Sequence, residues 1–284
     1  MIFQDKVELP LWDELPPEGA ENADRENFSH PAITMFAPPQ WKRYDKAIVI
    51  FPGGGHNYHT HPEGNFYAEY FASMGYWTFA VTYRLGGEKF IHPALLNDVA
   101  RSIRLVRNAA KELGFSPDKV GVMDSSAGGH LAAHISCCYD SDEIVYGKDE
   151  KEKVSSRPDF TIPCYPVNSG VRKKRHEKSF CRIPGKEKPT VEERKKVSPE
   201  LFVNKTTPKA FLWHRYHDLR VPLENSLLYA EKLRENGIPF ERHIYEKGGT
   251  EKVWTVTPHG VMPVFYGFPC FENPMQTEYN LHQK

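Results

Sequence analysis

The chain has 284 residues, of which 39% are hydrophobic and 13% aromatic, enough to bury one large core, so we expect a single domain over residues 1–284. Its 37 Lys and Arg balance its 37 Asp and Glu, which argues against a global field that recruits nucleic acid or an anionic membrane and favours a small neutral ligand. No apolar run approaches the roughly 18 residues of a membrane span, and the N-terminus MIFQDKVELP lacks a signal-peptide pattern, so we expect a cytoplasmic protein.

The cysteines indicate neither a disulfide framework nor a metal site. They are odd in number and show no CxxC spacing: Cys137, Cys138, Cys164, Cys181 and Cys270. We therefore expect reduced thiols that mostly serve packing.

Residues 1–40 are rich in proline and acidic side chains and contain two short extended segments, 7–12 and 32–37. We expect both to be edge strands of the domain.

From residue 46 onward, strand and helix patterns alternate. The segment KAIVIFP is a β-branched apolar run of the kind that fits a strand buried on both faces. Further strands are expected at 76–83, 119–124, 159–166, 209–214 and 240–246, and helices at 65–74, 93–113, from 126, and at 223–236. This alternation predicts an α/β fold with a mostly parallel central sheet, helices on both of its faces, and a ligand site at the carboxyl ends of the strands.

Two segments break the alternation. Residues 169–199 are strongly charged and lie between two expected strands, so they form either a lid over the site or a solvated loop with a short helix. Residues 263–284 have a weak helical pattern, and we expect an irregular tail on the surface.

The stretch GVMDSSAGGHLAAHIS, residues 121–136, resembles the nucleophile turn of a serine hydrolase. Such a turn, Gly-x-Ser-x-Gly, places a strained serine between a strand and a helix, and small neighbours let the adjacent backbones approach. Ser126 has Gly128 two residues after it but Asp124 two residues before it, where the pattern has glycine. We predict that Ser126 is the nucleophile; a serine that simply caps a helix is the alternative.

Three glycines follow the first central strand in FPGGGHNY. Consecutive glycines let backbone N–H groups face a developing oxyanion, and no phosphate-binding or dinucleotide-binding motif fits the spacing. We predict an oxyanion hole formed by the backbone N–H groups of Gly54, Gly55 and Ala127.

A loop after a later strand supplies a candidate acid in FLWHRYHDLRVPLENS. Asp218 lies there ahead of a helix, where it would orient a histidine and stabilise its charged form. A turn-forming aspartate is the alternative.

These motifs, together with TYRLGGEKFIHPALLNDVARSIRLVRNAAKELGFSPDKVGVM, resemble the α/β-hydrolase fold carboxylesterases of the acetyl esterase or xylan esterase-like family. The resemblance runs over residues 7–249. It implies an α/β-hydrolase fold, no cofactor, and removal of short acyl groups, often acetyl, from sugars or other small alcohols. It also implies catalytic roles for Ser126 and Asp218.

The chain departs from the family pattern at three positions. Asp124 replaces the first glycine of the turn, His217 precedes the acid, and Thr250 occupies the slot of the catalytic histidine in KGGTE. Related sequences often present this histidine as Pro-His-Gly after the last strand, so we predict that His259, in TPHGV, is the base, carried on an insertion of residues 250–258.

Two hypotheses from different classes follow. The first is a serine carboxylesterase acting on a small-molecule ester, such as an acetylated carbohydrate, through Ser126, His259 and Asp218. The second is a catalytically degenerate hydrolase-fold protein that binds a ligand or partner in the same pocket. A peptidase of the same fold is a weaker third.

Overall fold

The computed structural model describes residues 6–13, 16, 30–86, 90–173 and 175–246. Thr250, His259, Cys270 and the expected tail at 263–284 lie outside them. Within the described residues, no helix combines the length and apolar character needed to cross a bilayer.

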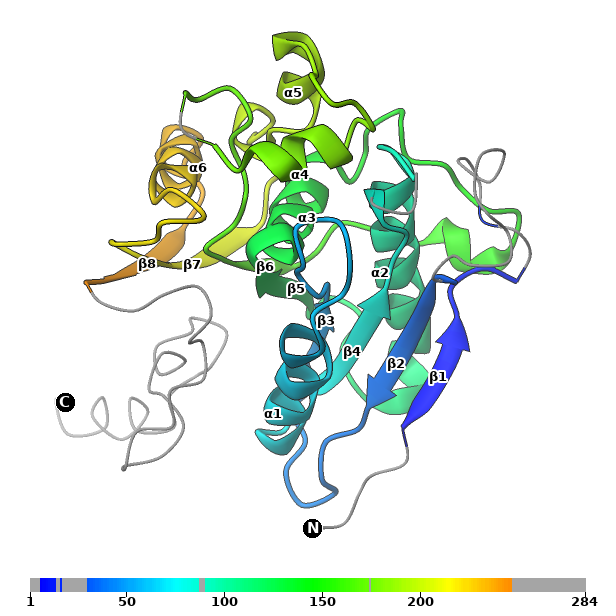
Figure 1. The fold of residues 1–284 in the computed structure, drawn as a ribbon. Coiled ribbons are helices and arrows are strands. Elements are labelled where there is room, and N and C mark those ends of the chain that lie inside the picture. The colour runs from blue at the N-terminus through cyan, green and yellow to red at the C-terminus, as the bar shows by residue number, and fades with distance from the viewer. Residues whose placement is uncertain (1–5, 14–15, 17–29, 87–89, 174, 247–284) are drawn as a thin grey trace, which may run out of the picture.

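A twisted sheet forms the centre of the fold (Figure 1). Its strands are β1 (Val7–Pro10), β2 (Ala32–Phe36), β3 (Ala47–Ile50), β4 (Trp77–Thr82), β5 (Val120–Ser125), β6 (Phe160–Cys164), β7 (Lys209–Arg215) and β8 (Phe240–Tyr245). They lie in the order β1-β2-β4-β3-β5-β6-β7-β8, with β1, β2 and β4 antiparallel and every other neighbouring pair parallel. The predicted mostly parallel sheet is thus observed.

The two N-terminal strands differ in position. β1 is at the edge of the sheet, as expected, but β2 is paired on both sides, with β1 and β4. The expectation that residues 32–37 form an edge strand is therefore wrong, because the backbone of β1 covers the outer side of β2.

The helices cover both faces of the sheet. They are α1 (Tyr67–Ser73), α2 (Ala94–Leu113), α3 (Ser126–Cys138), α4 (Glu177–Arg182), α5 (Val191–Lys196) and α6 (Glu224–Glu235), with short helical turns η1 (Pro62–Phe66), η3 (Glu150–Lys153) and η4 (Pro199–Leu201).

Alternate residues of the central strands point to opposite sides and so build two cores. Val49 packs in the core that contains residues of α2, α3 and α6, whereas Ile48 and Ile50 pack in the core that contains residues of α1. This explains why β3 is apolar at every position: neither face meets solvent.

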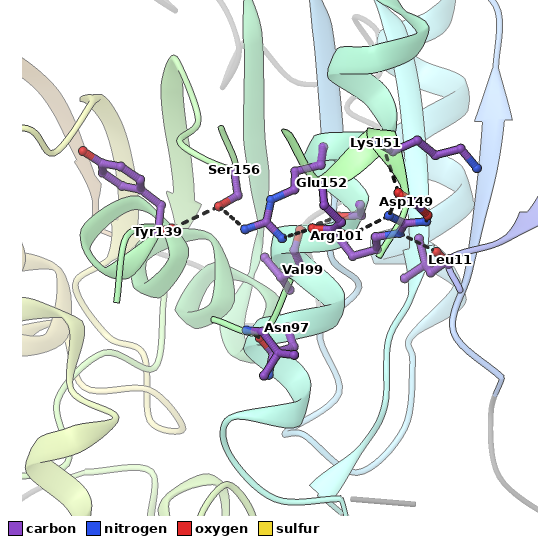
Figure 2. Close-up of polar contacts among 12 residues, drawn as sticks. Leu11, Asn97, Val99, Arg101, Tyr139, Asp149, Lys151, Glu152 and Ser156 are labelled. Carbon is purple, nitrogen blue, oxygen red and sulfur yellow. Dashed lines mark hydrogen bonds and ion pairs between the residues drawn. The ribbon is translucent and has the colours of Figure 1, made fainter. Parts of the chain in front are cut away.

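Helix α2 carries a buried ion network (Figure 2). Glu152 is 6% exposed and bridges two arginines, accepting from Arg101 Nη1 and from Arg104 Nη1, each at 2.6 Å. Arg101 also pairs with Asp149 and donates to the Leu11 carbonyl at 2.8 Å. The network therefore ties the segment after β1 and the turn η3 to the longest helix.

Replacement of Glu152 by glutamine is expected to destabilise the fold by about 3–5 kcal/mol, because two buried guanidinium groups lose their shared counter-charge. Equilibrium urea unfolding with unchanged m-value measures the loss. Glu150→Gln, in the same turn, is the matched control: its pair with Lys153 is exposed, so the change should stay within about 0.5 kcal/mol. A loss at Glu152 no larger than that of the control would contradict the structural importance of the network.

Candidate active site

Ser126 lies at an abrupt turn from β5 into α3, as predicted. Its φ is +55°, a conformation that non-glycine residues rarely adopt. A Cβ at Gly128 would meet the Phe51 carbonyl oxygen at 1.7 Å, so only glycine lets α3 approach β3 this closely. Ser126 lines a cavity of about 810 Å³ at the carboxyl ends of the strands. The geometry is that of a nucleophile elbow.

Ser125, the neighbouring hydroxyl, is fully buried. It forms a hydrogen bond of 2.9 Å with the Tyr67 hydroxyl, on the α1 side of the sheet. Ser125 therefore connects the elbow to α1, and Ser126 is the serine of the pair that lines the cavity.

Asp124, which replaces the usual glycine, is fully buried within the elbow. Its Oδ1 accepts from the Ser125 backbone N–H, while its Oδ2 has no hydrogen-bond partner among the described residues. Burial, and next the negative charge of Glu63, raise the pKa of Asp124 well above its ordinary value of 3.8, although the Ser125 and Gly53 backbone N–H groups favour the charged form. The elbow thus buries a carboxyl group whose charged form is disfavoured by its surroundings.

Replacement of Asp124 by glycine is expected to stabilise the protein by about 1 kcal/mol, since an unpartnered buried carboxyl oxygen costs about 1–3 kcal/mol and a strand glycine about 0.5–1 kcal/mol. Chemical unfolding at neutral pH measures the gain. A clear loss of both stability and activity would show that Asp124 has a role of its own.

Asp124→Asn is the isosteric control for ionisation. Because the folded-state pKa of Asp124 is raised, its contribution to stability is fully present below its ordinary pKa of 3.8 and is lost as pH rises through the folded-state pKa. The asparagine variant lacks this contribution, so the difference in unfolding free energy between wild type and variant should shift in favour of the variant as pH rises. A difference independent of pH would show that Asp124 titrates normally.

The glycine loop after β3 borders the same cavity. Gly54 and Gly55 both line it, with φ values of +132° and +63°. A Cβ at Gly54 would lie 1.9 Å from the Tyr58 carbonyl oxygen. Ala127 is the second residue of α3, where backbone N–H groups have no partner within the helix. Gly54 and Gly55 therefore line the same cavity as Ser126, and Ala127 directly follows the serine.

Asp218 lies in the loop between β7 and α6, and two neighbours in that loop, Arg220 and Val221, line the cavity. Its Oδ1 accepts from the backbone N–H groups of Arg220 at 2.9 Å and Val221 at 2.8 Å. Its Oδ2 is buried and has no hydrogen-bond partner among residues that the structure describes. Hydrogen bonds to Oδ1 thus fix the carboxylate, and Oδ2 is available to accept a hydrogen bond from an imidazole N–H.

The nearest histidine to Asp218 along the chain is not that donor. His214 Nε2 is 3.9 Å from Asp218 Oδ2, but it bonds to the Val221 carbonyl at 2.9 Å, and Nδ1 bonds to Ser226 Oγ at 2.7 Å. Both ring nitrogens are occupied, so His214 stabilises the loop.

Three further histidines of the described region do not line the cavity. His130 is buried and its Nε2 lies 2.9 Å from the Val197 carbonyl oxygen; His243, on β8, stacks on Phe211 at 5.2 Å. His217 is exposed and packs against Tyr216. The predicted base, His259, lies outside the described residues.

Sequence reasoning missed one histidine of the cavity. His176 lines it, and its Nδ1 lies 2.8 Å from Ser179 Oγ. Burial, and then the positive charges of Arg182, Lys178 and Arg220, lower the pKa of His176, while Asp218 opposes them. The segment RHEKSF reads as solvated charge, and only its packing onto the glycine loop brings the ring to the site.

Glu63 was missed for a similar reason. It follows Pro62 at the start of η1 and lines the cavity, with Oε1 accepting from the Tyr165 hydroxyl at 2.7 Å and Oε2 from Thr60 Oγ1 at 2.6 Å. Burial raises the pKa of this carboxyl group. No sequence signal links residue 63 to residue 165.

The charged segment 169–199 forms a cap that covers part of the cavity. Helix α4 lies above α3 in Figure 1. Phe180, Ile183 and Val197 are buried in a small apolar cluster with Val167 and Val221, so the segment is not merely a solvated loop. Its Arg182 donates from Nη1 to the Gly55 carbonyl at 2.8 Å, which connects the cap to the glycine loop.

The described part of the chain holds no group of three or more His, Cys, Asp or Glu side chains arranged to bind a metal ion. The cavity is lined instead by a serine hydroxyl, a glycine loop, a histidine and several charged side chains, and the loop of Asp218 borders it through Arg220 and Val221.

Comparison with known proteins gives a consistent result. The model of the BD-FAE family matches residues 33–233. The crystal structure of an acetyl ester-xyloside bifunctional hydrolase from Caldicellulosiruptor lactoaceticus is similar, with a TM-score of 0.77, 36% identity and 86% of each chain covered.

Two curated proteins are similar over most of this chain. An acetylxylan esterase of Xylanibacter ruminicola is 31% identical over 72% of this chain and 40% of its own length. Endo-1,4-beta-xylanase B of Butyrivibrio fibrisolvens is 32% identical over 71% of this chain and 31% of its own length. The chain therefore spans less than half the length of these relatives.

Proposed function

Since the chain belongs to the BD-FAE family of α/β-hydrolase esterases, we propose that it is a serine carboxylester hydrolase that removes acetyl groups from acetylated carbohydrates. The observation that carries the proposal is the position of Ser126: a strained serine at a strand-to-helix turn, facing a cavity that Gly54 and Gly55 also line.

We propose the following reaction for this site. Ser126 Oγ attacks the ester carbonyl carbon while His259 accepts its proton, and Asp218 orients the imidazole through its free oxygen. The backbone N–H groups of Gly54, Gly55 and Ala127 stabilise the oxyanion. His259 then returns the proton to the departing alcohol, and water hydrolyses the acyl-enzyme by the same steps, releasing acetate.

The carbohydrate part of the proposal rests on the relatives and on the wall of the cavity. Tyr58 lines the cavity and is 57% exposed, and aromatic rings suit the apolar faces of sugars. Tyr165 also lines the cavity, but it is only 2% exposed. A cavity of about 810 Å³ exceeds the size of an acetyl group and leaves room for sugar units.

A panel of nitrophenyl esters from acetate to octanoate, together with acetylated xylo-oligosaccharides, tests the proposal. We expect turnover of the acetylated oligosaccharides and a steep fall in kcat/KM beyond butyrate. Indifference to acyl length would refute the short-acyl specificity.

A serine-reactive fluorophosphonate probe separates the enzyme from a noncatalytic binding protein. Labelling of Ser126 at ordinary rates requires a working base. A protein that stays unlabelled and shows no turnover of any ester would be a ligand-binding member of the family.

A further inference from the structure

One wall of the cavity is cationic. Arg182 and Lys178 from α4, with Arg220 from the loop of Asp218, line it on the side of the cap. Arg175 also lines this wall, but its guanidinium pairs with Glu177 at 2.8 Å. Among the described residues, neither Lys178 nor Arg182 forms an ion pair, and Arg182 makes its hydrogen bond to a carbonyl oxygen.

Arg182, Lys178 and Arg220 all lie close enough to His176 to affect its ionisation. The pKa of His176, whose ring faces this wall, is lowered first by burial and then by Arg182, Lys178 and Arg220. One of these cations, Arg182, lies directly beside the glycine loop, where its Nη1 donates to the Gly55 carbonyl.

The acidic residues that line the cavity in the described part of the chain leave Lys178 and Arg182 without an ion pair. Glu177 pairs with Arg175, and both carboxyl oxygens of Glu63 accept hydrogen bonds, from Tyr165 and Thr60. Burial raises the pKa of Glu63. A neutral sugar ester needs hydrogen bonds and stacking surfaces, and gains little from several cations on one wall.

We propose that this wall recognises an anionic group on the alcohol part of the ester, and specifically that the preferred substrates are acetylated oligosaccharides that carry a uronic acid. This deepens the proposed function and rests on it. Carboxylate recognition by Arg182 and Lys178 places the acetylated sugar between the cap and Tyr58, with the acetyl group toward Ser126.

The experiment compares two acetylated xylo-oligosaccharides of equal length, one neutral and one bearing a glucuronic acid. We expect kcat/KM to favour the uronate about tenfold at roughly 10 mM salt and about threefold or less at roughly 300 mM salt, because ions screen the attraction. Lys178→Glu should remove most of this preference. Lys173→Glu is the matched control: the same charge change in the same segment, at a residue that lines a different cavity, should leave the preference within about twofold.

Equal kcat/KM for the two oligosaccharides at both salt concentrations, or equal effects of the Lys178 and Lys173 substitutions, would overturn the inference. Failure of the proposed function is a separate outcome. If neither oligosaccharide is hydrolysed, calorimetric titration of the protein with the two deacetylated oligosaccharides decides: tighter, salt-sensitive binding of the uronate supports the cationic wall, and equal affinities contradict it.

Discussion

Alanine in place of Ser126 is expected to lower acetyl ester turnover by about a millionfold. The acyl-enzyme forms on Ser126 Oγ, and no other hydroxyl of the elbow can replace it: Ser125 is buried and bonded to Tyr67. Initial rates with nitrophenyl acetate, alongside far-UV circular dichroism to confirm folding, measure the effect.

Ser125→Ala is the matched control. It removes a hydroxyl one residue away, at the cost of one buried hydrogen bond, about 1 kcal/mol of stability. Most of the activity should remain. Should Ser126→Ala keep more than about one per cent of wild-type turnover, the nucleophile is elsewhere and the covalent mechanism is wrong.

The central fold could be predicted from local pattern. The segment 46–52 reads as a doubly buried strand, and β3 is such a strand; the helix expected at 93–113 is α2, Ala94–Leu113. These elements follow from β-branched runs and amphipathic periodicity, which depend on near neighbours in the sequence. The α/β-hydrolase fold expected from the resemblance is likewise confirmed by the similarity to known esterase structures.

The elbow was also predictable, since its strand, its small residues and its helix are consecutive. The surroundings of Asp124 were not. A buried carboxylate at this position requires either a shift of the turn or a nearby donor. Burial raises its pKa most, and the neighbour that adds to this effect, Glu63, comes from a segment about sixty residues earlier. A pairing between distant segments leaves no local signal.

The packing of the cap could not be predicted from local sequence either. Its composition is that of a solvated segment, yet Phe180 and Ile183 bury against Val221 of the acid loop. Two apolar residues among many charges carry too weak a periodicity to predict this contact, so His176 and Arg182 went unassigned. Side chains that reach the site from an insertion are fixed by tertiary packing alone.

His259→Ala is expected to be as damaging as Ser126→Ala, about a millionfold in turnover, because the serine is a weak nucleophile without its base. The sequence Pro258-His259-Gly260 reproduces the usual neighbours of the base, while Thr250 in the familiar slot cannot accept the proton. Asp218 Oδ2 has no hydrogen-bond partner among the described residues, and we expect it to accept a hydrogen bond from the His259 imidazole.

His176 supplies the decisive comparison, since among the described residues it is the histidine that lines the cavity with Ser126. Its Nδ1 forms a hydrogen bond with Ser179 Oγ rather than with Asp218, so it lacks the carboxylate partner that a catalytic base requires. We therefore expect His176→Ala to lower activity by no more than about a hundredfold and to leave the pH profile of kcat unchanged. Rates of the His259→Ala, His176→Ala and His217→Ala variants with nitrophenyl acetate separate the possibilities. Background activity for His259→Ala alone supports the displaced base. If His176→Ala falls to background while His259→Ala resembles wild type, the base is His176. If wild type is no faster than Ser126→Ala, the protein binds its ligand without turning it over.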